Sequence, residues 1–124
     1  MTALLVPDYD EAIDFFTGAL GFLVEEDADL GAGKRWVVVR GTRGGKLLLA
    51  RAANDGQRAA VGNQAGGRVG WFVETDDFAR TQARMTAWGV EFAEEARQEI
   101  YGTVAVFSDP WGNRWDLIEP SKAQ

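Results

Sequence analysis

Apolar and polar positions change their period in the same order in both halves of the chain. In the first half, an apolar run at residues 1–6 predicts a strand. A stripe of large side chains spaced four, three and four residues apart predicts the helix that follows: Tyr9, Ile13, Phe16 and Leu20. Asp8 is placed to cap this helix and Gly21 to end it. Three further strands are predicted at about 22–26, 35–40 and 46–50.

The second half repeats this order of elements. A strand is predicted at about 68–74, and a helix carries Phe78, Met85 and Trp88 on one side before Gly89 ends it. Strands follow at about 90–95, 103–108 and 114–119. An offset of 68 residues aligns three pairs of residues between the halves: Gly21 with Gly89, Gly44 with Gly112, and Leu49 with Leu117. The sequence therefore predicts a duplicated strand–helix–three-strand unit.

This repeat defines the expected fold. We expect one domain over residues 1–124, with module one at about 1–50, a linker at 51–67 and module two at about 68–119. A single helix covers one face of each module's sheet, so the other face must meet a module, a subunit or a ligand. Pairing the modules predicts an α+β fold, in which duplicated βαβββ modules form a curled, eight-stranded mixed sheet with a cleft and helices on its outer face.

The composition excludes several kinds of chemistry. The chain contains no histidine and no cysteine, which removes imidazole bases, thiol nucleophiles and Cys/His zinc sites. A net charge of −6 argues against nucleic acid as a partner and favours, weakly, a cationic small molecule. No apolar run approaches the roughly 20 residues that cross a bilayer, so we expect no membrane partner and a cytoplasmic location.

Two segments resemble a known family. Residues 6–16 (VPDYDEAIDFF) resemble the opening of vicinal oxygen chelate proteins, and residues 109–117 (DPWGNRWDL) resemble their closing hairpin. This superfamily includes glyoxalase I, bleomycin resistance proteins and extradiol dioxygenases. The resemblance covers nearly the whole chain and implies a homodimer with a cleft between paired modules.

Relatives usually hold a divalent metal at four positions, one in the first and one in the last strand of each module. By resemblance these fall on Met1, Leu48, Gly70 (Val69 if the register shifts by one) and Asp116. Only Asp116 has a side chain that commonly binds metals, and one carboxylate is too few for a stable site. The sequence therefore predicts no cofactor, with a divalent metal as the alternative.

Strand alternation predicts which side chains line the cleft. Four of them share the face of the second module to which Gly70 belongs: Phe72, Glu74, Arg114 and Asp116. Glu74 is the candidate catalytic residue, as a general base with a raised pKa, although it also fits a solvated carboxylate at a strand end. Asp116 and Arg114 also fit a structural ion pair.

Two tryptophans are further candidate ligand contacts. Trp36 and Trp111 can stack on a flat molecule, although tryptophan also suits a core or a dimer interface.

Three functions remain open at this point. The first is a metal-free protein of the bleomycin-resistance type that binds a small aromatic or cationic molecule, and so could sequester an antibiotic. The second is a glyoxalase-like lyase or isomerase that uses Glu74 and Asp116. The third is an interaction module whose cleft is filled by another polypeptide.

Overall fold

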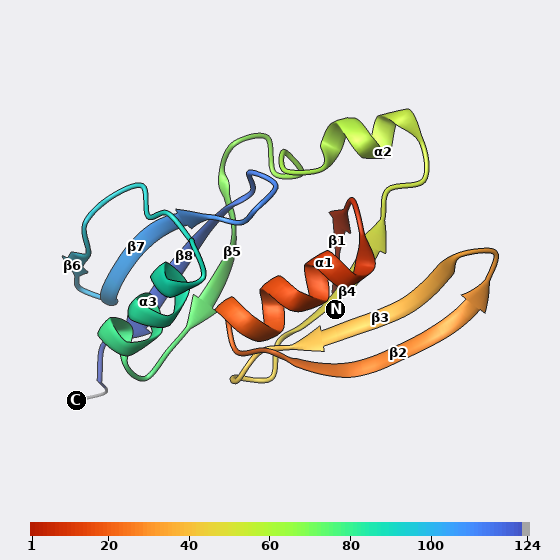
Figure 1. The fold of residues 1–124 in the computed structure, drawn as a ribbon. Coiled ribbons are helices and arrows are strands. Elements are labelled where there is room, and N and C mark those ends of the chain that lie inside the picture. Colours follow the sequence, from red (N-terminus) through yellow and green to blue (C-terminus); the bar gives the residue numbers. More distant parts are fainter. Residues whose placement is uncertain (123–124) are drawn as a thin grey trace.

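The computed structural model describes residues 1–122 and confirms the duplicated α+β modules (Figure 1). Module one contains four strands and one helical segment: β1 (Thr2–Val6), α1 (Tyr9–Asp14), η1 (Phe15–Ala19), β2 (Leu23–Gly31), β3 (Lys34–Arg40) and β4 (Lys46–Arg51). The linker contains the short helix α2 (Asp55–Ala60). Module two repeats the order of module one: β5 (Val69–Glu74), α3 (Phe78–Ala87), β6 (Arg97–Glu99), β7 (Gly102–Ser108) and β8 (Arg114–Pro120).

The eight strands form two separate four-stranded sheets and not one continuous curled sheet. The strand order is β1-β4-β3-β2 in module one and β5-β8-β7-β6 in module two. In each sheet the first strand runs parallel to the last strand of its module, and the other pairs are antiparallel. The two halves thus have the same mixed topology, as the repeat in the sequence predicts.

The first helix begins where its capping residue lies but changes its winding halfway. The side chain of Asp8 accepts a hydrogen bond of 2.8 Å from the backbone N–H of Glu11. From Phe15 onward the helix widens into a π-helical turn, which the side-chain spacing did not reveal. Gly21 then adopts a left-handed conformation (φ 69°), which glycine reaches without steric cost and which ends the helix.

The strand predicted at 90–95 is wrong. Within this segment only Phe92 forms an isolated bridge, to Phe107, and the second strand of the module lies later, at β6. The carboxylate of Glu94 accepts a hydrogen bond of 2.9 Å from the backbone N–H of Val106. This side chain takes a donor that a neighbouring strand would otherwise use, so the backbone ladder is interrupted.

A single hydrophobic core joins the two modules. The helix-facing side chains of both sheets belong to one buried cluster, and the ring of Phe16 in module one lies 5.7 Å from that of Trp115 in module two. The alternation predicted for strands is confirmed, since Leu47, Leu49 and Leu117 are all buried on the helix side. The opposite side of each sheet lies outside this core; we call these the open face of module one and the open face of module two.

The β7–β8 turn contains a buried carboxylate with many partners. Asp109 is 4% exposed, and its Oδ1 accepts hydrogen bonds from three successive backbone N–H groups, those of residues 111–113. Its Oδ2 accepts from Nδ2 of Asn113 at 2.8 Å and from Nε1 of Trp115 at 3.1 Å. The turn that the Asp-Pro-Trp-Gly pattern predicts is therefore also an anchor for a core tryptophan.

Among the helices of residues 1–122, none is long and apolar enough to cross a membrane.

Candidate functional site

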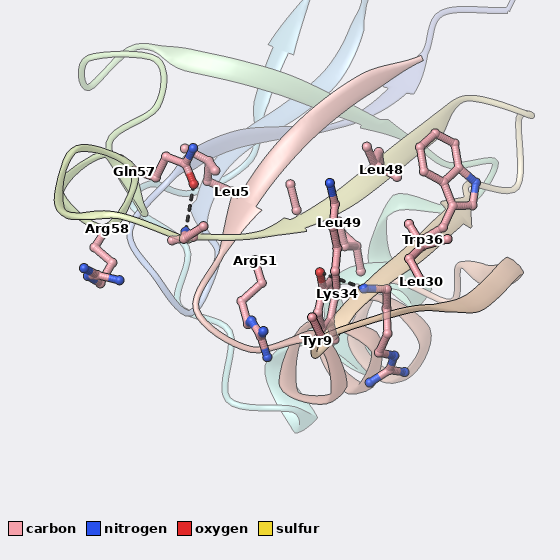
Figure 2. Close-up of a pocket in the computed structure, with 15 residues that line it drawn as sticks. Leu5, Tyr9, Leu30, Lys34, Trp36, Leu48, Leu49, Arg51, Gln57 and Arg58 are labelled. Carbon is pink, nitrogen blue, oxygen red and sulfur yellow. Dashed lines mark hydrogen bonds between the residues drawn. The ribbon is translucent and has the colours of Figure 1, made fainter.

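The open face of module one carries a hollow of about 720 Å³ (Figure 2). Its floor is apolar and comes from β1 and β4, with Leu5, Leu48 and Ala50. Trp36 and Leu30 form one side, and residues of the linker helix α2 form the other. Pockets for drug-sized ligands have volumes of about 300–1,000 Å³ and mostly apolar linings, so this hollow, called the module-one hollow below, has a suitable size and surface.

Trp36 is held in a fixed orientation at the edge of the hollow. Its Nε1 donates a hydrogen bond of 3.2 Å to the carboxylate of Glu26 on the neighbouring strand. The indole remains 37% exposed. Because one edge of the ring is bonded and its surroundings are apolar, the ring can present a flat surface to a ligand. The structure therefore places this predicted ligand contact beside a cavity.

Tyr9 and Arg51 lie on the lower side of the hollow in Figure 2, and Arg35 also lines it. The Tyr9 hydroxyl accepts a hydrogen bond of 3.1 Å from the backbone N–H of Arg35. The guanidinium groups of Arg35 and Arg51 each lie 5.2 Å from the centre of the Tyr9 ring, within the range of cation–π attraction. Tyr9 is the first residue of α1, so the start of the helix positions both cations.

Arg35 is largely neutralised by its acidic neighbours. It forms salt bridges of 2.8 Å to Asp27 and 2.9 Å to Asp10. The hydrogen bond to Asp27, followed by that to Asp10, raises the pKa of Arg35, and the pKa of Asp27 is lowered by the same contact. Through these two salt bridges, Arg35 on β3 connects this strand to both β2 and α1.

The open face of module two carries three of the other predicted contacts. Phe72 on β5 lies directly opposite Asp116 on β8 and is 63% exposed. Arg114 precedes Asp116 by two residues on the same strand and face. Among the described residues no salt bridge joins Arg114 to Asp116, so the ion pair that was the alternative interpretation of these two residues is not formed.

Asp116 is the most unusual carboxylate of this face. Its Oδ1 is buried and accepts no hydrogen bond from residues 1–122. Burial raises its pKa, although the nearby positive charge of Arg97 acts in the opposite direction. A carboxylate of this kind is available to accept a hydrogen bond from a partner that covers this face.

Glu74 lines a separate groove of about 380 Å³ between β4 and β5, and Asp116 is not part of that lining. Phe72 and Lys46 also line this groove. The side chain of Glu74 is about half exposed, and its carboxylate lies 3.7 Å from Arg43, which also bonds Asp76. This surface ion pair fits a solvated strand-end carboxylate better than an isolated general base.

Trp111 lies on neither open face. Its Nε1 donates a hydrogen bond of 2.8 Å to Glu11, and its ring centre lies 5.9 Å from that of Phe15 and 6.3 Å from that of Phe16. It thus connects the β7–β8 turn of module two to the helix of module one. Sequence spacing alone does not distinguish this packing role from ligand stacking.

The residues at the family's metal positions do not fit a metal ion. Met1, Leu48 and Gly70 offer no side chain that binds a hard divalent cation, and Asp116 is left alone. In residues 1–122 no three acidic side chains gather closely enough to hold an ion.

The sequence prediction missed most of the module-one hollow. Tyr9, Lys34 and Arg51 line it, but they were not among the predicted ligand contacts. Lys34 and Trp36 are two residues apart on β3 and therefore share a face, so strand alternation starting from Trp36 could have indicated Lys34. Arg51 was assigned to the linker, and only the structure shows that it folds back over Tyr9.

Comparisons with known proteins agree with this architecture. The family model described as Glyoxalase/Bleomycin resistance protein/Dioxygenase superfamily matches residues 1–117. An uncharacterized protein of Shewanella frigidimarina is 50% identical, with 98% of this chain and 93% of that protein covered.

Solved structures give the same result. The crystal structure of UcmS2 has a TM-score of 0.77 at 26% identity, and the alignment covers 95% of this chain and 94% of that chain. TnmS3, an antibiotic binding protein from Streptomyces sp. CB03234, has a TM-score of 0.69 at 28% identity, with 96% of this chain and 93% of that chain covered. With its two βαβββ modules and a family match over nearly its full length, the chain belongs to the Glyoxalase/Bleomycin resistance protein/Dioxygenase superfamily.

Proposed function

We propose that this protein is a metal-free binding protein that holds a small aromatic molecule in the module-one hollow. The observation that carries the proposal is the 720 Å³ hollow with the partly exposed ring of Trp36 at its edge. Aromatic walls over an apolar floor are typical of sites that bind flat molecules.

The biological outcome we propose is the sequestration of an antibiotic. TnmS3, a solved structure similar to this chain, is an antibiotic binding protein. Sequestration needs affinity and no reaction, so it is compatible with a chain that lacks histidine and cysteine and whose residues 1–122 contain no cluster of acidic side chains able to hold a metal.

We further propose that the binding form is a homodimer. Within one chain the two modules share their helix-side core, so each open face is free to be covered by another molecule. The exposed apolar side chains on these faces include Trp36, Leu30 and Phe72. A second copy whose module two covers the module-one hollow would bury these side chains and enclose the ligand.

The experiment that tests the binding function is titration of the purified protein with flat aromatic antibiotics, including anthraquinones, followed by calorimetry. We expect saturable binding with one ligand per chain and no chemical change in the recovered compound. The Trp36→Ala variant should bind at least about tenfold more weakly, because the stacking surface is lost.

A matched control uses another exposed tryptophan. Trp88 is 55% exposed but lies in module two, outside the hollow, so Trp88→Phe should bind like the original protein. Equal affinity of the Trp36 and Trp88 variants would refute the site. Turnover of the ligand, abolished by Glu74→Gln or Asp116→Asn, would instead support the lyase or isomerase alternative.

A further inference from the structure

The charged side chains that line the module-one hollow are all basic. They are Lys34, Arg35, Arg51 and Arg58, and no aspartate or glutamate joins them in the lining. The net charge of the chain is −6, so this local excess of positive charge opposes the overall charge. Local charge, and not net charge, decides which ligand a small cavity accepts.

Two of these four cations have their charge balanced by acids nearby. Arg35 is bonded to Asp10 and Asp27, and Arg58 lies 2.6 Å from Asp55. These two groups therefore offer little attraction to a further anion.

The other two cations, Lys34 and Arg51, have no acidic partner within the part of the chain that the structure describes. None of the salt bridges among residues 1–122 includes either of them. Arg51 lies over the ring of Tyr9, so one face of its guanidinium is supported while the N–H groups at its edge remain available. Figure 2 shows Lys34 extending from β3 along the hollow, on the side where Trp36 stands.

The carboxylate of Glu26, which contacts the indole of Trp36, already accepts a hydrogen bond. Glu26 accepts the hydrogen bond from Nε1 of Trp36 and is not part of the hollow's lining. A positively charged ligand in the hollow would therefore meet two unbalanced cations, and no carboxylate lines the hollow to balance it.

We propose that the ligand of the module-one hollow is an aromatic anion, such as a polycyclic carboxylate or phenolate. Its rings lie against Trp36 over the floor formed by Leu48 and Ala50, and Lys34 and Arg51 contact its negative group. This inference rests on the proposed function, and it replaces the cationic ligand that the net charge suggested. An arginine edge matches a carboxylate with two parallel hydrogen bonds, and a lysine adds a mobile point charge.

The test compares three probes that share one ring system and differ in charge: 9-anthracenecarboxylate, 9-anthracenemethanol and 9-(aminomethyl)anthracene. Affinities are measured at pH 7.5 by calorimetry and by tryptophan fluorescence. We expect the carboxylate to bind about tenfold or more tightly than the alcohol, and the ammonium compound to bind most weakly.

Variants then assign the preference to residues. Lys34→Gln and Arg51→Gln should each weaken carboxylate binding by about fivefold to tenfold and leave binding of the alcohol nearly unchanged. Lys34→Arg keeps the charge and should keep the preference. The matched control is Arg80→Gln on α3, which lowers the net charge equally in the other module and should change no affinity.

The possible failures are distinguishable. If the three probes bind equally, or if the ammonium compound binds best, the anion assignment is wrong while aromatic binding stands. If both glutamine variants keep the full preference for the carboxylate, Lys34 and Arg51 are not the contacts. If none of the probes binds at about 1 mM, the hollow is not an aromatic site and the proposed function fails as well.

Discussion

Removal of the Asp109 carboxylate should destabilise the protein more than any other single polar substitution outside the ligand site. The structure gives this side chain five hydrogen bonds: three from backbone N–H groups, one from Asn113 and one from Trp115. In Asp109→Ala the partly buried backbone donors of residues 111 and 112 can turn to water. Three buried donors lose their acceptor: Nε1 of Trp115, Nδ2 of Asn113 and the backbone N–H of Asn113.

The magnitude follows from these three groups. Leaving a buried donor unsatisfied costs about 1–3 kcal/mol, so three donors, each near the lower end of that range because the turn can relax, cost about 4 kcal/mol in total. Small proteins unfold in urea with slopes of about 1–3 kcal/mol/M, so the midpoint should fall by about 2 M. Asp109→Asn keeps one carbonyl acceptor but points an amide at two donors, so it should lose about half as much.

The assay is urea unfolding, monitored by circular dichroism and by tryptophan fluorescence. The matched control is Asp55→Ala, which removes a fully exposed carboxylate from a surface pair with Arg58 and should change the free energy of unfolding by less than about 0.5 kcal/mol. A loss below about 1 kcal/mol in Asp109→Ala would refute the reasoning, because it would mean that the buried donors find other partners.

Three further predictions concern packing, assembly and pH. Gly18→Ala should destabilise the protein by about 1–3 kcal/mol, because its new Cβ would overlap the ring of Trp88. Gly56→Ala in α2 meets only ordinary contacts and should be neutral, so thermal unfolding compares the two variants, and equal stability would contradict the helix packing. Phe72→Asp should shift the chain toward the monomer in sedimentation velocity if the open faces form the dimer, and an unchanged sedimentation coefficient would argue against that interface. Asp116→Asn should stabilise the protein at pH 7: the folded-state pKa of Asp116 is raised by burial, so its stabilising contribution is complete below the ordinary value of 3.8 and is lost as pH rises through the folded-state pKa. Chemical unfolding at pH 3 and pH 7 checks this, with the difference from the original protein absent at the lower pH.

Much of the fold could be predicted because the repeat and the capping residues are local signals. Asp8, Gly21 and Gly89 mark helix ends by chemistry that acts within a few residues, and the structure confirms the helices they bound. The strand predicted at 90–95 was wrong because its outcome depends on Glu94, whose partner Val106 is distant in sequence. The division into two sheets likewise depends on contacts between modules, which no local pattern encodes.

The candidate site was less predictable than the fold. Trp36 and Trp111 were both chosen because an indole can stack on a flat ligand. That property alone cannot tell that Trp111 packs against Phe15 whereas Trp36 lies beside the hollow. The charge of the hollow was also hidden. Arg35 is neutralised by Asp10 and Asp27 whereas Arg51 is not, and this distinction appears only when distant segments are placed together.

The shared core has a consequence for the covalent connection between the modules. The two sheets share no strand pair, yet their helix-side residues bury one another in a single cluster. Each half therefore carries a complete backbone ladder but only part of a hydrophobic interior. We expect a chain cut near residue 65 to yield two fragments that are unstable alone and that reassemble when mixed, because each fragment lacks the other half of the hydrophobic interior.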